Sequence, residues 1–395
     1  MVLPELCFPI YWIQDLIRFA KRSQIGIVTG LQYLADDKGR RYNYILTILP
    51  FASGKRNFKN AFLYIRDKND YSPIEFEELA RPVLHIGGGS NLLFTGDFMG
   101  TVLHSNINFI EILDDSSCHP ERSEGSATPV LVSVGAGGGF DDFCEWAAKE
   151  GLWGVENLSY IPGEVGASAV QNIGAYGVEA KDVIHKVYCY DTVEEEFVNF
   201  SVEECGYGYR DSIFKKPEIK GRYIVTHVVF ALSREPKPQL GYGHLRDAVM
   251  AVVGVSDEPT PAVIRKVIIK IRKEKLPEPS VMGSAGSFFM NPVITKEHYL
   301  QIEAAAKKEL GEDYKVPHYD LPDGTVKVPA AWMIEQCGWK GRRSGGAAVY
   351  EKQPLVIVNY TGEAYPEEII GLERRIIASV KAKFGVELHP EVDHI

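Results

Sequence analysis

Two glycine-rich turns, each directly after a short apolar run, mark where this chain could hold a phosphate. The run Pro82–Ile86 ends in Gly87–Gly89, and the run Val130–Val134 ends in Gly135–Gly139. A glycine turn after a strand exposes backbone N–H groups and carries no side chains, so that a diphosphate can approach closely. Together the two turns predict one extended ligand that carries phosphate.

Neither turn matches the two common nucleotide-binding motifs. The third glycine position of G-x-G-x-x-G holds Leu92 in the first turn and Phe140 in the second. A P-loop needs Ser or Thr after its lysine, but Arg56 follows Gly54 and Lys55. These mismatches exclude a Rossmann fingerprint and a P-loop. The turns alone also leave open a purely structural role.

Longer sequence blocks are far more specific than the turns. Four of them follow one another as Gly87–Leu93 (GGGSNLL), Gly151–Gly177 (GLWGVENLSYIPGEVGASAVQNIGAYG), Gly208–Lys215 (GYRDSIFK) and Gly286–Pro292 (GSFFMNP). Shorter matches lie at Arg272–Pro277, Ala331–Gly338, Gly345–Val349 and Pro390–Val392. In content and order these segments resemble the UDP-N-acetylenolpyruvoylglucosamine reductase (MurB) family from about residue 82 to residue 395. The resemblance implies an α+β fold, with an FAD-binding fold of the vanillyl-alcohol-oxidase (PCMH) type in two subdomains and a C-terminal α+β substrate-binding domain.

The reaction that the resemblance implies is the NADPH-dependent reduction of UDP-N-acetylglucosamine enolpyruvate to UDP-N-acetylmuramate through bound FAD, in peptidoglycan precursor synthesis. The flavin supplies the hydride after a nicotinamide has reduced it. Negative charge then develops on the substrate carboxylate, so the protein must place a cation or hydrogen-bond donors there. A proton must also reach the second carbon of the double bond.

Three residues receive catalytic roles from the resemblance. Arg210 matches the cation beside the carboxylate, Ser287 matches the proton donor, and Glu391 matches a carboxylate beside the same substrate group. Without the resemblance, Arg210 could form a surface ion pair with Asp211, Ser287 could cap a turn, and Glu391 could lie in an exposed tail. Alternate residues around Glu391 would share one face of a strand and could hold a metal, although the family needs none.

The resemblance also assigns residues to cofactor and substrate binding. The cofactor is predicted to be noncovalent FAD, with its diphosphate on the backbone amides of residues 87 to 91, and the cofactor residues are Gly87, Gly88, Gly89, Ser90, Asn91, Leu92, Gly163, Gly166, Ala167, Gln171, Asn172, Gly174, Ala175, Tyr176 and Gly177. The UDP-sugar residues are Tyr209, Tyr242, Arg272, Lys275, Asn291 and Gln336, of which Tyr242 indicates the family variant with a tyrosine lid loop. The chain departs from the family pattern at Ser284, Met290 and Tyr350.

Hydrophobic periodicity predicts the elements that must position these residues. Helices are expected at 140–150, at 263–275 and at 367–384, the last with Gly385 as C-cap. Residues rich in β-branched and aromatic side chains predict strands within 183–198, at 223–232 and at 355–358. Both halves of the chain are therefore expected to be α+β.

The expected domain organisation has three parts. Residues 1–235 form the FAD-binding region, 240–387 the substrate-binding domain, and 388–395 a C-terminal strand that returns Glu391 to the active site. Pro236 and Pro238 mark the boundary between the first two parts. The polar segment 114–128 is expected to be an exposed insertion, and residues 1–80 lack the usual family pattern.

Composition limits the partners. The 395 residues are 45% hydrophobic and 24% charged, with a formal net charge of −10, which is typical of a globular protein without a positive field for nucleic acid or anionic membranes. The 6 cysteines form no C-x-x-C pair, and no secretory signal is recognisable, so we expect reduced thiols in the cytoplasm. The expected partners are a UDP-sugar substrate and a nicotinamide nucleotide, with no nucleic acid, membrane, metal or obligate protein partner.

Two other functions remain open from the residues. A flavin oxidase of the same fold would pass its electrons to oxygen, and a nucleotide-sugar binding protein would have lost the flavin through its divergent N-terminal segment. An absorption spectrum distinguishes the second from a flavoenzyme, and anaerobic reoxidation by the enolpyruvyl substrate distinguishes the first.

Overall fold

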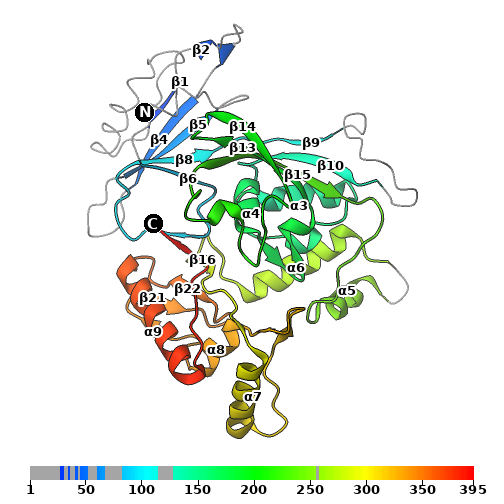
Figure 1. The fold of residues 1–395 in the computed structure, drawn as a ribbon, viewed down its shortest axis with the longest axis vertical. Coiled ribbons are helices and arrows are strands. Elements are labelled where there is room, and N and C mark those ends of the chain that lie inside the picture. The colour runs from blue at the N-terminus through cyan, green and yellow to red at the C-terminus, as the bar shows by residue number, and fades with distance from the viewer. Residues whose placement is uncertain are drawn as a thin grey trace. The chain divides into compact units, whose positions relative to one another are not determined.

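The computed structural model describes residues 27–30, 34–35, 41–42, 45–51, 60–66, 82–113, 128–254 and 258–395 (Figure 1). The chain divides into two compact units, residues 1–89 with 97–272, and residues 90–96 with 273–395. These compact units have other bounds than the predicted parts 1–235, 240–387 and 388–395. Compactness does not test which part binds which ligand, so the predicted organisation stays a prediction. The predicted 114–128 insertion lies outside the described residues except for its last residue, and most of residues 1–80 lie outside them as well.

The first unit contains two five-stranded sheets. One has the order β1-β4-β5-β8-β6, with β5, β8 and β6 parallel to one another; its strands are β1 Ile27–Gly30, β4 Ile45–Phe51, β5 Asn60–Arg66, β6 Val83–Ile86 and β8 Thr101–Ser105. A small pair, β2 Leu34–Ala35 with β3 Arg41–Tyr42, accompanies it. Because β6 ends at Ile86, this sheet delivers the first glycine turn.

The second sheet of this unit is antiparallel, with the order β14-β13-β15-β10-β9. Its strands are β9 Ile110–Ile112, β10 Val130–Gly135, β13 Ile184–Asp191, β14 Glu196–Ser201 and β15 Tyr223–Leu232. The helices α3 Phe140–Lys149 and α4 Val165–Gln171 lie on one side of this sheet (Figure 1). Phe143 and Phe230 are fully buried between them, with ring centroids 4.7 Å apart. The burial of each such side chain contributes about 1.5–3 kcal/mol.

The described part of the first unit also contains two further helices and three short helical turns. α5 Leu245–Val253 and α6 Pro261–Lys275 share a buried apolar cluster that includes Val249, Ile264 and Ile268. The short hairpin β11 Gly174–Ala175 with β12 Val178–Glu179 and the 3-10 turns η2 Glu156–Leu158, η3 Ala180–Asp182 and η4 Ile213–Lys215 connect the larger elements. The division between the units falls inside α6, after Arg272.

The second unit builds its own core around a four-stranded sheet of order β16-β22-β21-β20. Its strands are β16 Gly283–Ser287, β20 Arg343–Ser344, β21 Ala347–Val349 and β22 Val356–Asn359, and its helices are α7 Lys296–Leu310, α8 Ala330–Gln336 and α9 Pro366–Phe384. The unit also contains a small three-stranded sheet of β17 Val293–Ile294, β19 Val326–Lys327 and β18 Tyr319–Asp320, in that order. The parallel pair β7 Leu92–Leu93 with β23 Asp393–His394 joins distant parts of the sequence.

Most of the predicted elements are confirmed with small shifts at their ends. The helices expected at 140–150, 263–275 and 367–384 are α3, α6 and α9, and Gly385 ends α9 with a φ of +67°. The strand residues expected within 183–198 form two strands, because a turn at residues 192–195 separates β13 from β14. Within the described residues, no helix has the length and apolar content needed to cross a membrane.

Candidate active site

Arg210 lies at the tip of a tight turn. Asp211 N–H donates to Gly208 O (3.2 Å), and Gly208 N–H donates to Asp211 O (2.9 Å). Arg210 is the third of these four residues and has a φ of +54°. Glycine or asparagine usually takes such a position, because a Cβ crowds the backbone there. The fold therefore holds this arginine in a backbone conformation that its side chain does not favour.

The guanidinium of Arg210 is bound by the segment that the sequence assigns to the flavin. Its Nη1 donates to Asn172 O (3.2 Å) and its Nη2 donates to Gly174 O (2.6 Å). The ring of Tyr209 lies 5.4 Å from the guanidinium carbon. Asp211, the alternative ion-pair partner, pairs with Lys216 at 2.8 Å. Arg210 is thus part of a local network and not of a surface pair with its neighbour.

The hairpin β11–β12 carries several of the predicted cofactor residues. Tyr176 and Gly177 connect its strands with φ values of +49° and +82°, as in a type I′ turn. The buried Asn157 holds this turn, because its Nδ2 donates to Tyr176 O (2.9 Å). The ring of Tyr242 stands edge-on to the ring of Tyr176, with centroids 5.9 Å apart. The structure therefore brings the predicted lid tyrosine to the predicted flavin hairpin.

Arg272 joins the same group of side chains. Its Nε donates to Tyr160 O (3.0 Å). Burial lowers the pKa of Arg272 below its usual value, an effect that the nearby Tyr176 opposes. Burial likewise raises the pKa of Tyr176. Lys275 is exposed as the last residue of α6.

The first glycine turn lies against the start of α4, where other predicted cofactor residues are found. A Cβ at Gly87 would lie 3.1 Å from Ala167 Cβ, and a Cβ at Gly88 would lie 3.7 Å from the backbone of Gly163. The turn ends at Gly89, which has a φ of +70°. The two predicted cofactor segments, 87–89 and 163–167, are therefore brought together.

The residues at this turn fit a flavin nucleotide. Side chains at positions 87 and 88 would fill the space beside α4, so their absence leaves a backbone cradle for a diphosphate. Gln171 Oε1 accepts a hydrogen bond from Lys215, whereas its Nε2 is buried without a partner among the described residues. A buried donor of this kind is suited to an acceptor on a bound group.

The second glycine turn has a different use. Val165 N–H donates to Gly138 O (3.0 Å) and Gly166 N–H donates to Ala136 O (2.9 Å), so the turn seats the start of α4. A Cβ at Gly137 would lie only 2.3 Å from Ser105 O. Close packing therefore explains why glycine occupies position 137 of the second turn. The same holds for Gly166, because a Cβ there would lie 2.8 Å from Ala136 Cβ. The expectation that both turns face one ligand stays a prediction.

In the second unit, the segment that contains Glu391 pairs with the residues directly after Ser287, through an isolated bridge between Phe289 and Pro390. Glu391 N–H donates to Phe288 O (2.9 Å), and Met290 N–H donates to His389 O (3.0 Å). Asn91 Nδ2 donates to Glu391 O (3.0 Å). The C-terminal segment therefore runs beside the residues that follow Ser287 and beside the residues that follow the first glycine turn. Ser287 itself is exposed at the end of β16.

The residues next to Ser287 have structural roles. Phe288 and Phe289 are 2% and 1% exposed and belong to the core of the unit, so they anchor the strand on which the serine lies. Asn291 Oδ1 accepts a hydrogen bond from Ala330 N–H (2.9 Å) at the start of α8. Asn291 thus fixes α8, and its predicted contact with the substrate stays a prediction.

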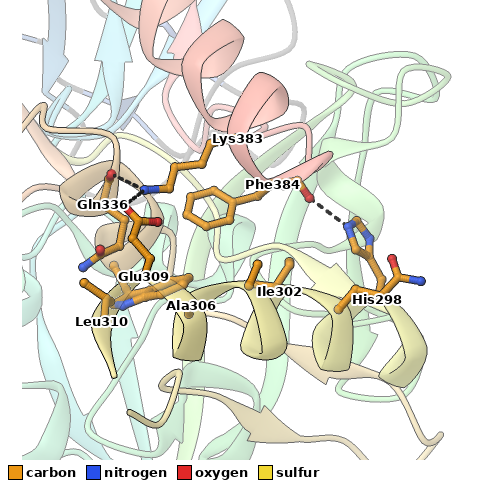
Figure 2. A pocket seen from close by; sticks show the side chains of 11 residues that line it. His298, Ile302, Ala306, Glu309, Leu310, Gln336, Lys383 and Phe384 are labelled. Atoms are coloured by element: carbon orange, nitrogen blue, oxygen red, sulfur yellow. Dashed lines mark hydrogen bonds and ion pairs between the residues drawn. The ribbon is translucent and has the colours of Figure 1, made fainter. Parts of the chain in front are cut away.

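Gln336 lines a cavity of about 290 Å³ between α7, α8 and α9 (Figure 2). Lys383 Nζ reaches across to Gln336 O (3.1 Å) and Glu309 Oε1 (3.0 Å). None of the other predicted site residues lines this cavity. The predicted contact of Gln336 with the substrate stays a prediction.

Three charged or titratable residues at the first glycine turn were missed by the sequence reading. Glu164 precedes α4, and its Oε1 lies 2.6 Å from His104 Nε2 on β8. Its Oε2 would lie 3.3 Å from a Cβ at Gly87. Burial, and then the neighbouring His104, lower the pKa of His85 to about 4. No motif marks these residues, because their proximity depends on the pairing of β6 with β8 and on the position of α4. In the described part of the chain, no group of three or more His, Cys, Asp or Glu is placed to hold a metal ion.

Comparisons with known proteins identify the family of this chain. Residues 278–395 match the model of the UDP-N-acetylenolpyruvoylglucosamine reductase C-terminal domain, and residues 75–199 match an FAD binding domain. A UDP-N-acetylenolpyruvoylglucosamine reductase of Bacteroides fragilis is 49% identical over 80% of this chain and 87% of its own length. The one from Chromobacterium violaceum is 42% identical over 91% of this chain and 98% of its own length.

A solved structure confirms the predicted fold. UDP-N-acetylenolpyruvylglucosamine reductase (MurB) from Thermus caldophilus superimposes with a TM-score of 0.55 at 20% identity, over 88% of this chain and 99% of that one. The α+β fold with an FAD-binding domain is therefore the one expected from the sequence blocks. From the identity with its relatives and the FAD binding domain, we conclude that this chain is an FAD-containing oxidoreductase that belongs to the UDP-N-acetylenolpyruvoylglucosamine reductase family.

Proposed function

We propose that this enzyme uses NADPH to reduce UDP-N-acetylenolpyruvoylglucosamine to UDP-N-acetylmuramate, as a step of peptidoglycan precursor synthesis. Family membership supports the substrate. The structural observation that carries the proposal is the attachment of the Arg210 guanidinium to the cofactor hairpin through Gly174 O. Such an attachment suits a cation that must act on a substrate next to the flavin.

Arg210 is the proposed electrostatic catalyst. When bound, FAD supplies the hydride for the C=C bond of the substrate. Arg210 would hold the enolpyruvyl carboxylate and stabilise the negative charge that develops there. The planar guanidinium can bind both carboxylate oxygens at once, which a lysine cannot do.

Ser287 and Glu391 are the proposed residues for proton delivery. Ser287 would donate the proton to the substrate carbon that does not receive the hydride. A hydroxyl is a weak acid, so its role depends on close placement and on the basicity of the receiving carbon. Glu391, held beside the same strand through Glu391 N–H and Phe288 O, would contact the carboxylate end of the substrate.

The remaining predicted residues are proposed to bind the nucleotides. Arg272, Lys275 and Tyr242 would contact the UDP part of the substrate, with Tyr242 closing over it and excluding water. FAD would lie along the first glycine turn and the hairpin around Tyr176, held noncovalently. The buried thiols of Cys144, Cys189 and Cys205 are free, which supports a reducing compartment, and we place the enzyme in the cytoplasm.

Anaerobic half-reactions test the proposal. The purified protein should carry a flavin spectrum, and acid denaturation should release all of the flavin. NADPH should bleach that spectrum, and UDP-N-acetylenolpyruvoylglucosamine should restore it with formation of UDP-N-acetylmuramate. If oxygen but not the enolpyruvyl compound restored it, the enzyme would be a flavin oxidase and the proposal would be wrong. A colourless protein that binds no added FAD would contradict it as well.

A further inference from the structure

A side chain on Gly174 would displace the guanidinium of Arg210. A Cβ on Gly174 would lie 2.7 Å from Arg210 Nη1, which is shorter than any ordinary contact of such an atom. Gly174 has no positive φ, because it lies in the strand β11, so its backbone would accept alanine. The same Cβ would lie 3.0 Å from Glu179 Cγ and 3.0 Å from Val178 O, so Arg210 Nη1 is the closest of three atoms that crowd a side chain here. Contacts, and not the conformation of the chain, therefore favour glycine at this position.

Asn172 contacts both the turn that contains Arg210 and the guanidinium of Arg210. It is fully buried, at 0% exposure, and has a φ of +48°. Its Nδ2 donates to Gly208 O (2.7 Å), and its backbone oxygen accepts from Arg210 Nη1 (3.2 Å). One residue therefore holds both the first residue of the Arg210 turn and the guanidinium at the end of the side chain.

We infer that Gly174 and Asn172 are positioning residues for Arg210, a role different from the flavin contacts that the sequence resemblance implies. The inference rests on the proposed function of Arg210. Two backbone carbonyls fix the plane of the guanidinium, and that plane sets the direction of its other N–H groups. Hydrogen bonds to a developing charge depend strongly on direction, so a tilted guanidinium would bind the transition state less well.

Gly174→Ala tests this role with a single methyl group. The atom that must move furthest is the end of the flexible Arg210 side chain, whereas Glu179 Cγ and Val178 O at 3.0 Å need to give by only a few tenths of an ångström, so the variant should fold and keep its FAD. Flavin reduction by NADPH should stay within about twofold of wild type, whereas anaerobic reoxidation by UDP-N-acetylenolpyruvoylglucosamine should slow by about 30-fold or more. Loss of FAD affinity, or equal slowing of both half-reactions, would place Gly174 at the flavin and overturn the inference.

Coupling to Arg210 separates positioning from other effects of the methyl group. In an Arg210→Ala background, Gly174→Ala should slow reoxidation by less than about twofold further, because no guanidinium is left to displace. If the double variant were slowed by the product of the two single-variant factors, the two residues would act independently and the inference would be wrong. Gly371→Ala in α9 is the matched control, since its Cβ would meet nothing closer than Arg375 Nη1 at 3.7 Å. It should change neither half-reaction.

A chemical readout keeps the inference separate from the proposed function. In the holoenzyme, Gly174→Ala should make Arg210 react with phenylglyoxal several-fold faster, measured by peptide mass spectrometry, whichever substrate the enzyme uses. If Gly174→Ala does not fold, Asn172→Gly keeps the positive φ, removes the side chain that holds Gly208, and should give the same labelling and reoxidation results. Unchanged labelling in a folded variant would refute the positioning role, whereas faster labelling in an enzyme that is inactive on the enolpyruvyl substrate would refute only the proposed function.

Discussion

At the scale of single residues, the side chains of the site stand on backbone that is unfavourable for them. Five non-glycine residues have positive φ in the part of the chain that the structure describes, and four of them are Tyr160, Asn172, Tyr176 and Arg210. Tyr160, Tyr176 and Arg210 each cost about 1–2 kcal/mol relative to a relaxed conformation, and Asn172 costs less, because asparagine tolerates positive φ. Glycine or a small polar residue would remove this cost. We infer that these side chains are kept for what they contact.

Arg210→Gly and Arg210→Ala should therefore differ in stability although both abolish turnover. Glycine accepts the φ of +54° and alanine does not, so the Gly variant should be more stable than the Ala variant by about 1 kcal/mol in denaturant unfolding. Glu195, in the turn between β13 and β14 with a φ of +57°, is the matched control. Its Gly and Ala variants should show the same difference in stability and normal activity. Equal stabilities of the two Arg210 variants would contradict strain at this turn.

Ser287 gives the sharpest prediction for the chemical step. Ser287→Ala should fold, bind FAD and be reduced by NADPH at a near-normal rate, but its kcat with the enolpyruvyl substrate should fall by several orders of magnitude. Ser287→Cys keeps a transferable proton and should recover part of that loss. A Ser287→Ala enzyme with more than about a tenth of wild-type kcat, a barrier change below ~1.4 kcal/mol, would mean that another group delivers the proton.

At the scale of elements, one carboxylate ties α3 to the helix that carries Arg272. Asp141, in the first turn of α3, accepts two hydrogen bonds from the guanidinium of Arg265 on α6 and one from Tyr160 N–H. Tyr160 O in turn accepts from Arg272 Nε. Asp141 therefore links α3, Tyr160 and α6 in one hydrogen-bonded chain, in addition to the apolar packing of α6.

Asp141→Asn should weaken binding of the sugar nucleotide more than catalysis. The apparent KM should rise about 3- to 10-fold with little change in kcat, because the affected helix carries two of the proposed binding residues and none of the proposed catalytic ones. The variant should also lose about 1–2 kcal/mol of stability, since Asp141 is partly exposed. Asp142→Asn removes a neighbouring charge from the same helix turn and should leave both values unchanged. An unchanged KM in Asp141→Asn would remove α6 from substrate binding.

The ion pair of Asp141 with Arg265 predicts that the stability of the protein depends on pH. Burial alone would raise the pKa of Asp141, but the hydrogen bonds and charge of Arg265 lower it below the ordinary value of 3.8. A carboxylate with a lowered pKa stabilises the fold fully above its unfolded value and loses this contribution as the pH falls through the folded value. The stability difference between wild type and Asp141→Asn should therefore be constant at neutral pH and shrink below about pH 4.

At the scale of the whole molecule, the sequence predicted repeated patterns well and isolated contacts poorly. α6 and α9 follow from apolar spacing, and the family follows from the order of the sequence blocks along the chain. The turn of Arg210 could not be predicted, because arginine has no preference for positive φ. The role of Asn172 was missed because its partner Gly208 lies 36 residues away. Spacing along the chain predicts local elements such as helices. The contacts of Arg210 and Asn172, by contrast, depend on hydrogen bonds between residues that are far apart in the sequence.

Removal of residues 393–395 should affect the flavin although none of them was predicted to touch it. Asp393 N–H donates to Asn91 O and Ile395 N–H donates to Leu93 O, so β23 completes the strand that follows the first glycine turn. We expect the Kd for FAD, measured by flavin fluorescence of the apoprotein, to rise about tenfold or ~1.4 kcal/mol. Ile395→Ala keeps the backbone bonds and should bind FAD normally. A truncated protein with wild-type affinity would show that β7 needs no partner.

The pairing of β7 with β23 also fixes an order of events during synthesis. The residues that meet in the Asn91–Glu391 hydrogen bond are 300 positions apart in sequence. A growing chain folds its N-terminal parts first, as they leave the ribosome. The strand after the first glycine turn therefore stays unpaired until a segment some 300 residues further along the chain has been synthesised. A nascent chain that has passed the first glycine turn thus carries an exposed strand edge at β7, which could pair with another chain until β23 is made.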